Sequence, residues 1–178
     1  MILKRLTLLL LASLFVVFYS FRLPQRLMKK VTKEIEKTFN VKDFTLKPLL
    51  IDVETQAKLQ KHIGKEQLFK ITKDTLHIGY AFIDKAPSKT DEFDYLILLD
   101  KDLVIAKAKL LIYREDYGSE IGSRRWLKQF IGKTGKDKLK YERDIRAISG
   151  ATISAHSMTR AINIFLKNLV ILHKNNIL

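Results

Sequence analysis

Apolar residues recur at helical spacing near both ends of the chain. In residues 24–39 they stand four apart, while lysine and glutamate occupy most of the other positions. In residues 154–173 they stand three and four apart. Such spacing places them on one face of an α-helix. The pattern therefore predicts an amphipathic helix in each range, and it also predicts shorter helices over 55–64 and 124–132.

Between these helices the chain changes to short runs rich in β-branched, aromatic and leucine residues, which are typical of strands. A first run over 44–52 contains Pro48, which cannot donate to a ladder and therefore favours an edge position. Alternation is cleanest over 104–112, where Lys107 and Lys109 fall on the side opposite the apolar residues. We therefore expect an antiparallel sheet with one face toward water. The later runs cover residues 68–72, 75–84, 93–100 and 104–115.

The order of these segments predicts the fold class. A meander of strands with helices before and after it is typical of an α+β domain. At 178 residues the chain is long enough for one such domain with appendages. We predict an antiparallel sheet flanked by helices, with a connecting helix at 24–40 and the domain itself at 41–178.

The first residues of the chain have a different composition. Lys4 and Arg5 precede an uncharged run from Leu6 to Phe21. A basic start followed by an apolar run is typical of signal peptides and membrane anchors, and no pair of small residues marks a cleavage site. We therefore expect 1–23 to be a membrane anchor or signal-anchor. Positive charge on both sides of the run leaves its orientation open.

Overall charge and cysteine content exclude several classes of function. The chain has 33 Lys and Arg against 19 Asp and Glu, and its formal net charge of +14 attracts polyanions without choosing among them. Because there is no cysteine, disulfides, thiolate nucleophiles and iron–sulfur clusters are excluded. The histidines lack ligand spacing and no nucleic-acid-binding motif is present. We therefore expect neither a metal nor a nucleic acid as a ligand.

A turn of very small residues precedes the last predicted helix. Ser149, Gly150, Ala151 and Thr152 form the sequence SGAT in a chain with only 7 glycines. The first N–H groups of a helix lack intrahelical partners and carry partial positive charge, so a glycine-containing turn there is suited to an anion, phosphate above all. A plain Ser/Thr N-cap uses the same residue types. The residues alone leave both interpretations open.

This SGAT turn, placed before a long amphipathic helix, resembles the signature of the FMN-binding domain family. That family includes flavin-bearing subunits of sodium-pumping NADH:quinone oxidoreductases and of Rnf-type complexes. The similarity extends over about residues 70–172. It implies FMN as the cofactor, with the FMN phosphate joined by a flavin transferase to the hydroxyl of Thr152. It also places Glu115 and Gly118 where the family has an acidic residue and a glycine turn.

One position departs from the family pattern. The family usually has an aspartate three residues before the motif serine, where this chain has Arg146, and Asp144 lies two positions earlier. Either Asp144 takes the place of that aspartate, or Arg146 pairs with the phosphate, as guanidinium groups do. Covalent attachment and reversible binding of FMN therefore both stay open.

Several side chains before the motif are candidates to contact the flavin. Tyr113, Tyr117 and Trp126 have rings that could stack on the isoalloxazine or serve ordinary packing. Arg124 and Arg125 could stabilise the phosphate or a reduced flavin, or form a solvated helix face. Glu115 could accept a hydrogen bond from the flavin or cap a turn. The cofactor-binding residues that we predict are Thr152, Ser149, Gly150, Ala151, Glu115, Gly118, Arg146 and Trp126.

The resemblance implies a membrane-anchored flavoprotein that carries electrons, more an electron carrier than a stand-alone catalyst. Its domain would face the periplasm or cell exterior at the cytoplasmic membrane. Its partners would be a membrane redox complex or another electron carrier, together with the flavin transferase that modifies it. Two alternatives remain: the same fold binding FMN reversibly, and a non-enzymatic, membrane-tethered basic module that holds an anionic partner. Bound FMN would distinguish a flavoprotein from the basic module.

Overall fold

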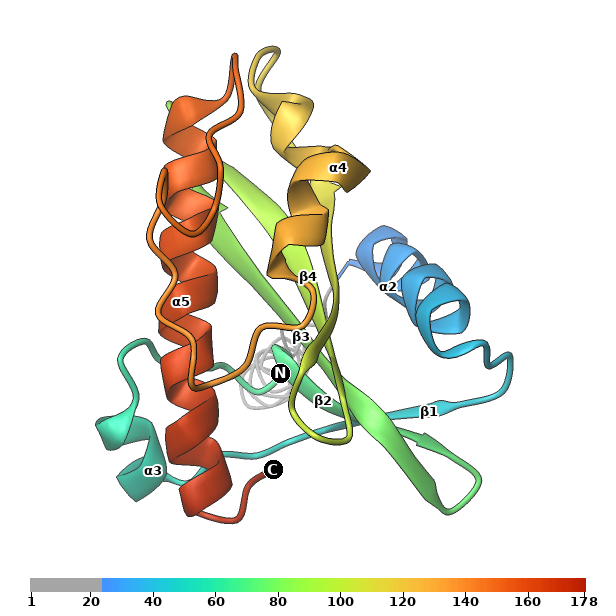
Figure 1. Ribbon diagram of the computed structural model, residues 1–178. Coiled ribbons are helices and arrows are strands. Elements are labelled where there is room, and N and C mark those ends of the chain that lie inside the picture. Colours follow the sequence, from blue (N-terminus) through green and yellow to red (C-terminus); the bar gives the residue numbers. More distant parts are fainter. Residues whose placement is uncertain (1–23) are drawn as a thin grey trace, which may run out of the picture.

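The computed structural model describes residues 24–178 (Figure 1), and the predicted anchor at 1–23 lies outside the described residues. Five strands form one antiparallel sheet in which spatial order follows chain order. This arrangement confirms the predicted α+β class with an antiparallel sheet. The strands are β1 (Thr45–Pro48), β2 (Leu68–Lys73), β3 (Leu76–Pro87), β4 (Glu92–Asp100) and β5 (Ile105–Ile112).

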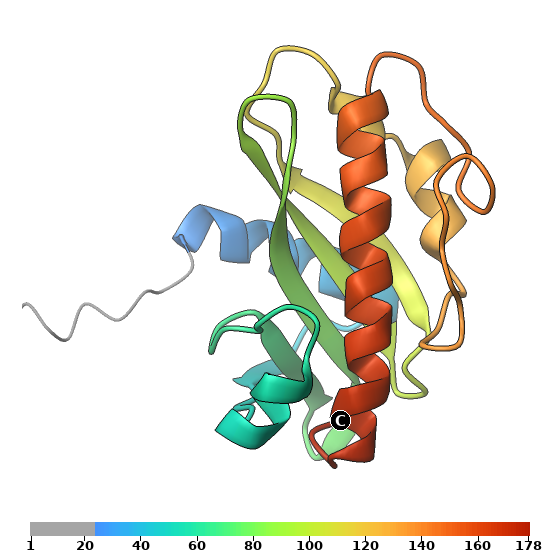
Figure 2. The same cartoon turned by 90° about the vertical axis from the view of Figure 1, so that its left-hand side faces the viewer.

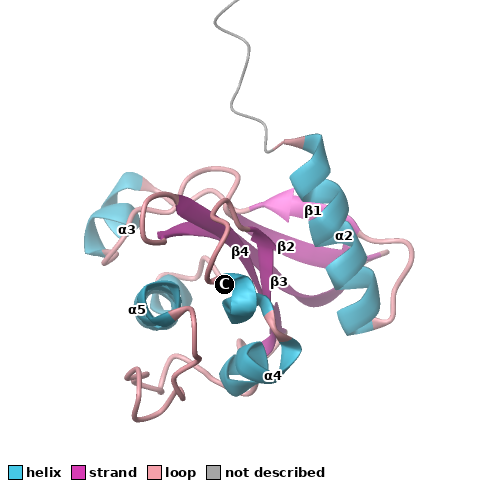
Figure 3. Ribbon diagram, turned by 90° about the horizontal axis from the view of Figure 1, so that it is seen from above, coloured by secondary structure: helices cyan, strands magenta, loops and turns pink. Residues whose placement is uncertain are grey.

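Helices cover both faces of this sheet (Figure 3). Helix α2 (Gln25–Phe39) lies on one face, and its buried side chains Leu27, Val31 and Ile35 belong to the core on that side. The opposite face carries α5 (Thr152–Lys174), with α3 (Val53–Lys58) and α4 (Arg124–Leu127) beside it. The chain therefore folds into three layers, with the sheet in the middle.

Each face of the sheet has its own apolar core. On the α5 side, the rings of Phe82 in β3 and Phe165 in α5 stack with centroids 3.8 Å apart. On the α2 side, Ile83, Leu96 and Leu98 of β3 and β4 meet the buried stripe of α2. Neighbouring residues of one strand thus serve opposite cores, as the pleat of a strand requires.

The expectation that one face of the sheet would be open to water is wrong. Helix α2, the predicted connecting helix, packs on that face. Lys109 of β5 is half-buried there and pairs with Glu34 of α2 at 3.7 Å, while Lys30 Nζ donates to the Leu111 carbonyl at 2.6 Å. The lysines in β5 therefore reflect polar contacts with a covering helix. Alternation alone does not distinguish such contacts from exposure to solvent.

Element ends differ from the predicted ones where local capping decides them. Asp52 accepts a hydrogen bond from the Thr55 amide at 2.8 Å and starts α3, which ends at Lys58, well before the predicted end at residue 64. The helix predicted over 124–132 ends as α4 and continues as a 3-10 turn, η2 (Lys128–Phe130). Helix α5 begins at Thr152, so the last residue of the SGAT turn is the first helical residue.

Three segments that are distant in the sequence meet at one end of the molecule, the upper end in Figure 2. The first is the hairpin loop at 88–91, which follows the Pro87–Glu92 pair of β3 and β4. The second is the chain leaving β5, because Ile112 pairs with Asp94 near that same loop. The third is the start of α5. Within residues 24–178, no helix combines the length and apolarity that a membrane span requires.

Candidate functional site

An open cavity of about 740 Å³ lies where these three segments meet. Its walls are residues 89–90 of the hairpin loop, 113–118 after β5, and 150–154 at the start of α5. Its volume lies within the roughly 300–1,000 Å³ that small-molecule and cofactor pockets usually have. We call it the first cavity.

The start of α5 gives the first cavity a positively polarised wall. Ala151 occupies the N-cap position, and no side chain caps the first turn of this 23-residue helix. The first helical hydrogen bond runs from the Ala155 amide to the Ala151 carbonyl at 2.8 Å, so the amides of residues 152–154 precede it. Such amides and the helix dipole favour an anion. Thr152, the first of these residues, is exposed and lines the cavity.

Two glycines with positive φ shape the same wall. Gly150 has φ +81° and Gly118 has φ +93°, a region that side chains rarely adopt. A Cβ on the buried Gly118 would overlap the hydroxyl of Tyr113 and lie 3.7 Å from the Gly150 carbonyl oxygen. The Tyr113 hydroxyl in turn lies 2.9 Å from Ser154 Oγ in the first turn of α5. Gly118 thus lets the β5 exit approach the SGAT turn closely.

Glu115 fixes the hairpin loop that forms the third wall. Its Oε1 accepts hydrogen bonds from Ser88 Oγ at 2.5 Å, from the Thr90 amide at 2.7 Å and from the Asp91 amide at 3.1 Å. These bonds favour the charged carboxylate, so they lower the pKa of Glu115 from 4.5 to about 2. Of the two roles that the sequence left open for Glu115, the structure displays turn capping.

We predict that this clamp makes the protein sensitive to acid. Because the folded-state pKa of Glu115 is lowered, its stabilising contribution is complete above about pH 4.5 and is lost as the pH falls toward 2. The free energy of unfolding, measured by urea titration between pH 2 and 5, should fall more steeply for wild type than for Glu115→Gln. Other carboxylates titrate in both proteins and cancel in the comparison. Parallel curves would contradict the role of Glu115.

Two further charged residues of the first cavity differ in how they are held. Arg114 Nη2 contacts Asp94 Oδ2 at 2.5 Å and Nη1 donates to the Glu92 carbonyl at 2.7 Å, which ties this guanidinium to β4. Lys89 is exposed on the hairpin loop and forms no ion pair with any residue of the described chain. Lys89 was missed by sequence reasoning because a lysine in a polar turn gives no signal of its own.

Trp126 and Arg146 lie on the other side of the SGAT turn, in a second cavity of about 650 Å³. The Trp126 ring is only 3% exposed and packs edge-on against Phe130, with centroids 5.2 Å apart. Its Nε1 donates to the Arg146 carbonyl at 2.8 Å. Trp126 therefore positions the chain that leads to the motif. Ser149 also lines the second cavity, and its side chain is exposed.

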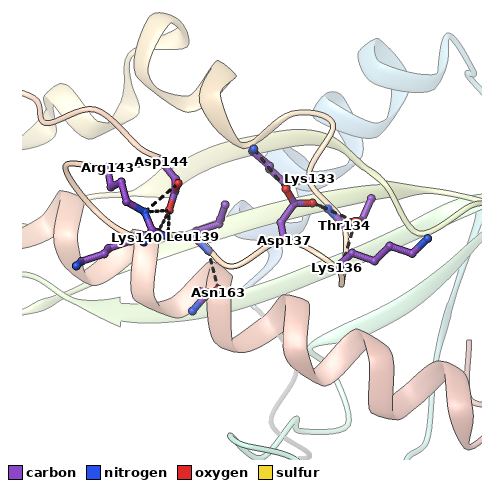
Figure 4. A network of polar contacts seen from close by, with 9 residues as sticks. All are labelled: Lys133, Thr134, Lys136, Asp137, Leu139, Lys140, Arg143, Asp144 and Asn163. Atoms are coloured by element: carbon purple, nitrogen blue, oxygen red, sulfur yellow. Dashed lines mark hydrogen bonds and ion pairs between the residues drawn. The ribbon is translucent and has the colours of Figure 1, made fainter.

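Asp144, the possible substitute for the family's aspartate, is engaged elsewhere (Figure 4). It accepts hydrogen bonds from Arg143 Nη2 at 3.0 Å and from the Lys140 amide at 2.8 Å, and these contacts lower the pKa of Asp144. A further bond, from the Leu139 amide to Asn163 Oδ1 at 3.0 Å, attaches this loop to α5. Asp144 lines neither cavity.

The structure thus divides the predicted residues between the two cavities. Gly150, Ala151, Thr152, Glu115 and Gly118 lie together around the first cavity. Ser149, Arg146 and Trp126 line the second. The other two aromatic candidates also line the first cavity: Tyr117 is 85% exposed, whereas Tyr113 packs against Phe93.

Fold and site together define a small α+β domain in which the start of a helix is suited to bind an anion. Residues 89–167 match the family model of the FMN-binding domain. This stretch runs from the hairpin loop into α5 and includes all three walls of the first cavity. This match supports assignment of residues 89–167 to the FMN-binding domain family, and it indicates a flavoprotein whose cofactor is FMN. No curated protein matches the chain.

The residues of the first cavity fit FMN. The uncapped start of α5 suits the phosphate. Because Gly118 has no Cβ, its turn can lie close to the turn at Gly150. The volume of the cavity is ordinary for a cofactor of this size. The exposed ring of Tyr117 suits an aromatic partner.

Proposed function

We propose that the protein is a membrane-anchored electron carrier whose FMN is esterified through its phosphate to Thr152. The observation that carries this proposal is the position of Thr152. Its exposed side chain is the first of α5, it lines the cavity, and it makes no hydrogen bond with the described residues. A hydroxyl so placed is accessible to a modifying enzyme and adjacent to the amides that would hold the product's phosphate.

The attachment is a phosphoryl transfer. A flavin transferase would bring FMN as a phosphoanhydride, whose P–O–P bond breaks while a P–O bond forms to Thr152 Oγ1. The threonine proton leaves with the transferase's base, and the second phosphate of the donor is the leaving group. The product equals protein plus FMN less one water. The phosphodiester keeps one negative charge, which the first-turn amides of α5 stabilise.

Bound FMN supplies transfer of one or two electrons, while the chain supplies binding and electrostatics. The helix start binds the phosphate, and the turns at Gly118 and Gly150 bring the walls together. Glu115 holds the hairpin loop in one conformation, which fixes the place of Lys89 at the cavity.

The proposed anchoring rests on the sequence, and the proposed location of the domain rests on the family resemblance. The apolar run after Lys4 and Arg5 supports an anchor. Its flanking charges leave the orientation open, and the resemblance to the FMN-binding domain family is what supports a domain that faces the periplasm or cell exterior. There a membrane redox complex or a second carrier would exchange electrons with the flavin.

Reversible binding of FMN is the second candidate, and Arg146 favours it. This residue stands where the family usually has an aspartate, its side chain lines the second cavity, and Asp144 does not take the missing place. If the transferase must recognise that aspartate, this chain would not be modified and would hold FMN by non-covalent contacts alone.

The deciding experiment is the intact mass and absorbance of the full chain, exported in a bacterial host together with a flavin transferase and purified in detergent. Covalent attachment predicts a mass increase of FMN less one water and a yellow colour that survives denaturation. A yellow protein of unchanged mass that releases flavin on denaturation would replace this proposal by reversible binding. A colourless protein would contradict both proposals and favour the alternative of a basic module that holds an anionic partner.

A further inference from the structure

The second cavity combines buried apolar residues with exposed positive charge. Trp126 is buried and Ile148 half-buried, whereas the Arg125 and Arg146 side chains are exposed. Ser149 lines this cavity and Gly150 lines the first, so the SGAT turn is the partition between them. A group bound in the second cavity would therefore lie close to a flavin held in the first.

Hydrogen bonds to both its backbone amide and its backbone carbonyl fix the position of Arg146. Its amide donates to Gln129 Oε1 at 2.8 Å, and its carbonyl accepts from Trp126 Nε1 at 2.8 Å. Gln129 is itself held, because its Nε2 donates to the Trp126 carbonyl at 3.2 Å. The arginine thus projects from a supported backbone, which lowers the entropy lost when its side chain binds a partner.

Positive charge prevails around this cavity. Among residues 24–178, neither Arg125 nor Arg146 takes part in an ion pair. Two further exposed cations, Arg124 and Lys128, lie on the same short helical segment. The acidic residue in the lining is Glu120, whose carboxylate lies beside Gly150, 3.5 Å from where a Cβ would stand.

We infer that the second cavity is a docking site for an acidic surface of a protein partner. Carboxylates of that partner would pair with Arg125 and Arg146, while an apolar side chain would rest on Ile148. The exposure of both arginines suits a broad surface better than a small enclosed ligand. That the partner exchanges electrons with the flavin rests on the proposed function, whereas the docking itself does not.

A membrane surface would also attract arginines, but the fold argues against it. Helix α4, which carries Arg125, and α2 lie on opposite faces of the sheet (Figure 3). The described chain begins at Pro24, just before α2. The second cavity therefore lies on the side of the sheet away from the point where an N-terminal anchor would join.

The test uses the full chain without flavin, in detergent at low salt, with a fluorescent decaglutamate peptide as the acidic probe. Arg125→Glu with Arg146→Glu should weaken binding by about tenfold or more. The matched control, Lys42→Glu with Lys47→Glu, makes the same charge change at the other edge of the sheet, because Lys47 lies in β1 and Lys42 just before it. This control should weaken binding less than about twofold. Both arginine side chains are exposed, and unchanged thermal unfolding would show that the variants fold.

Two outcomes would overturn the inference. Equal weakening in both double variants would mean that the peptide responds only to overall charge. Unchanged peptide binding in the arginine variant, with lost binding to vesicles of phosphatidylglycerol, would mean that this face meets a membrane. Because the protein in the assay carries no flavin, failure here is independent of whether Thr152 becomes flavinylated.

Discussion

Replacing Thr152 by alanine should abolish covalent loading with FMN completely. The proposed attachment needs a hydroxyl at the first residue of α5, and alanine removes it while preserving the backbone that would bind the phosphate. Because Thr152 is exposed and alanine is a better helix former, stability should change by no more than about 0.5 kcal/mol. Intact mass after co-expression with a flavin transferase measures the loss directly.

Thr152→Ser is the matched control, because it keeps a hydroxyl at the same place. It should regain covalent FMN at least in part. Ser149 and Ser154 offer hydroxyls on either side of Thr152, so a mass increase that persists in the alanine variant would place the linkage elsewhere. Peptide mapping would then identify the modified residue and contradict the assignment to Thr152.

Gly118→Ala should be strongly destabilising and should impair flavin loading. A left-handed backbone costs a residue with a Cβ roughly 1–2 kcal/mol, and crowding in a packed site adds about 1–3 kcal/mol. The new Cβ would push the Tyr113 ring away from Ser154, which joins the β5 exit to α5. We expect a loss of about 2–5 kcal/mol in the free energy of unfolding, measured by urea titration.

Gly132→Ala separates the two causes of this loss. Gly132 also has a positive φ, +83°, but a Cβ there would meet no atom within 4 Å. Its replacement should therefore cost only the backbone term, about 1–2 kcal/mol. In the double variant Gly118→Ala with Tyr113→Phe, removal of the hydroxyl should recover part of the crowding cost. If Gly118→Ala costs no more than Gly132→Ala, the close approach of the two turns does not constrain the protein.

Local patterns were sufficient for most of the secondary structure and for the motif. The four-residue spacing in α2, the later β runs and the long apolar stripe of α5 all correspond to observed elements. The SGAT turn identified the helix start that forms one wall of the first cavity. These features depend on neighbouring residues, which is why a sequence reveals them.

The covering of both sheet faces could also have been predicted, from β4 instead of β5. Residues 95–99 form an unbroken apolar run, which is typical of a strand buried on both sides. The alternating lysines of β5 drew attention to a solvated face, although β5 is an edge strand beside α2. The sequence of a central strand shows whether both faces of the sheet are covered, whereas the half-buried edge strand β5 does not show this.

The composition of the site could not be predicted in full, because it depends on strand register. Only the pairing of Ile112 with Asp94 brings Glu115 to the hairpin loop and places Lys89 in the same wall as Thr152. Likewise, the bond from Trp126 to the Arg146 carbonyl joins residues twenty positions apart and places Trp126 in a structural role. Neither relation leaves a periodic signal in the sequence.

The sheet also determines how this module can be moved between proteins. The family match begins at residue 89, but β4, which follows at once, has β3 as its partner on one edge. A fragment cut at the limits of the match would leave that edge unpaired and the stacked partner of Phe165 missing. The portable unit is therefore larger than the segment that matches the family, and any fusion that transplants this flavin domain should carry the strands and helices that precede the match.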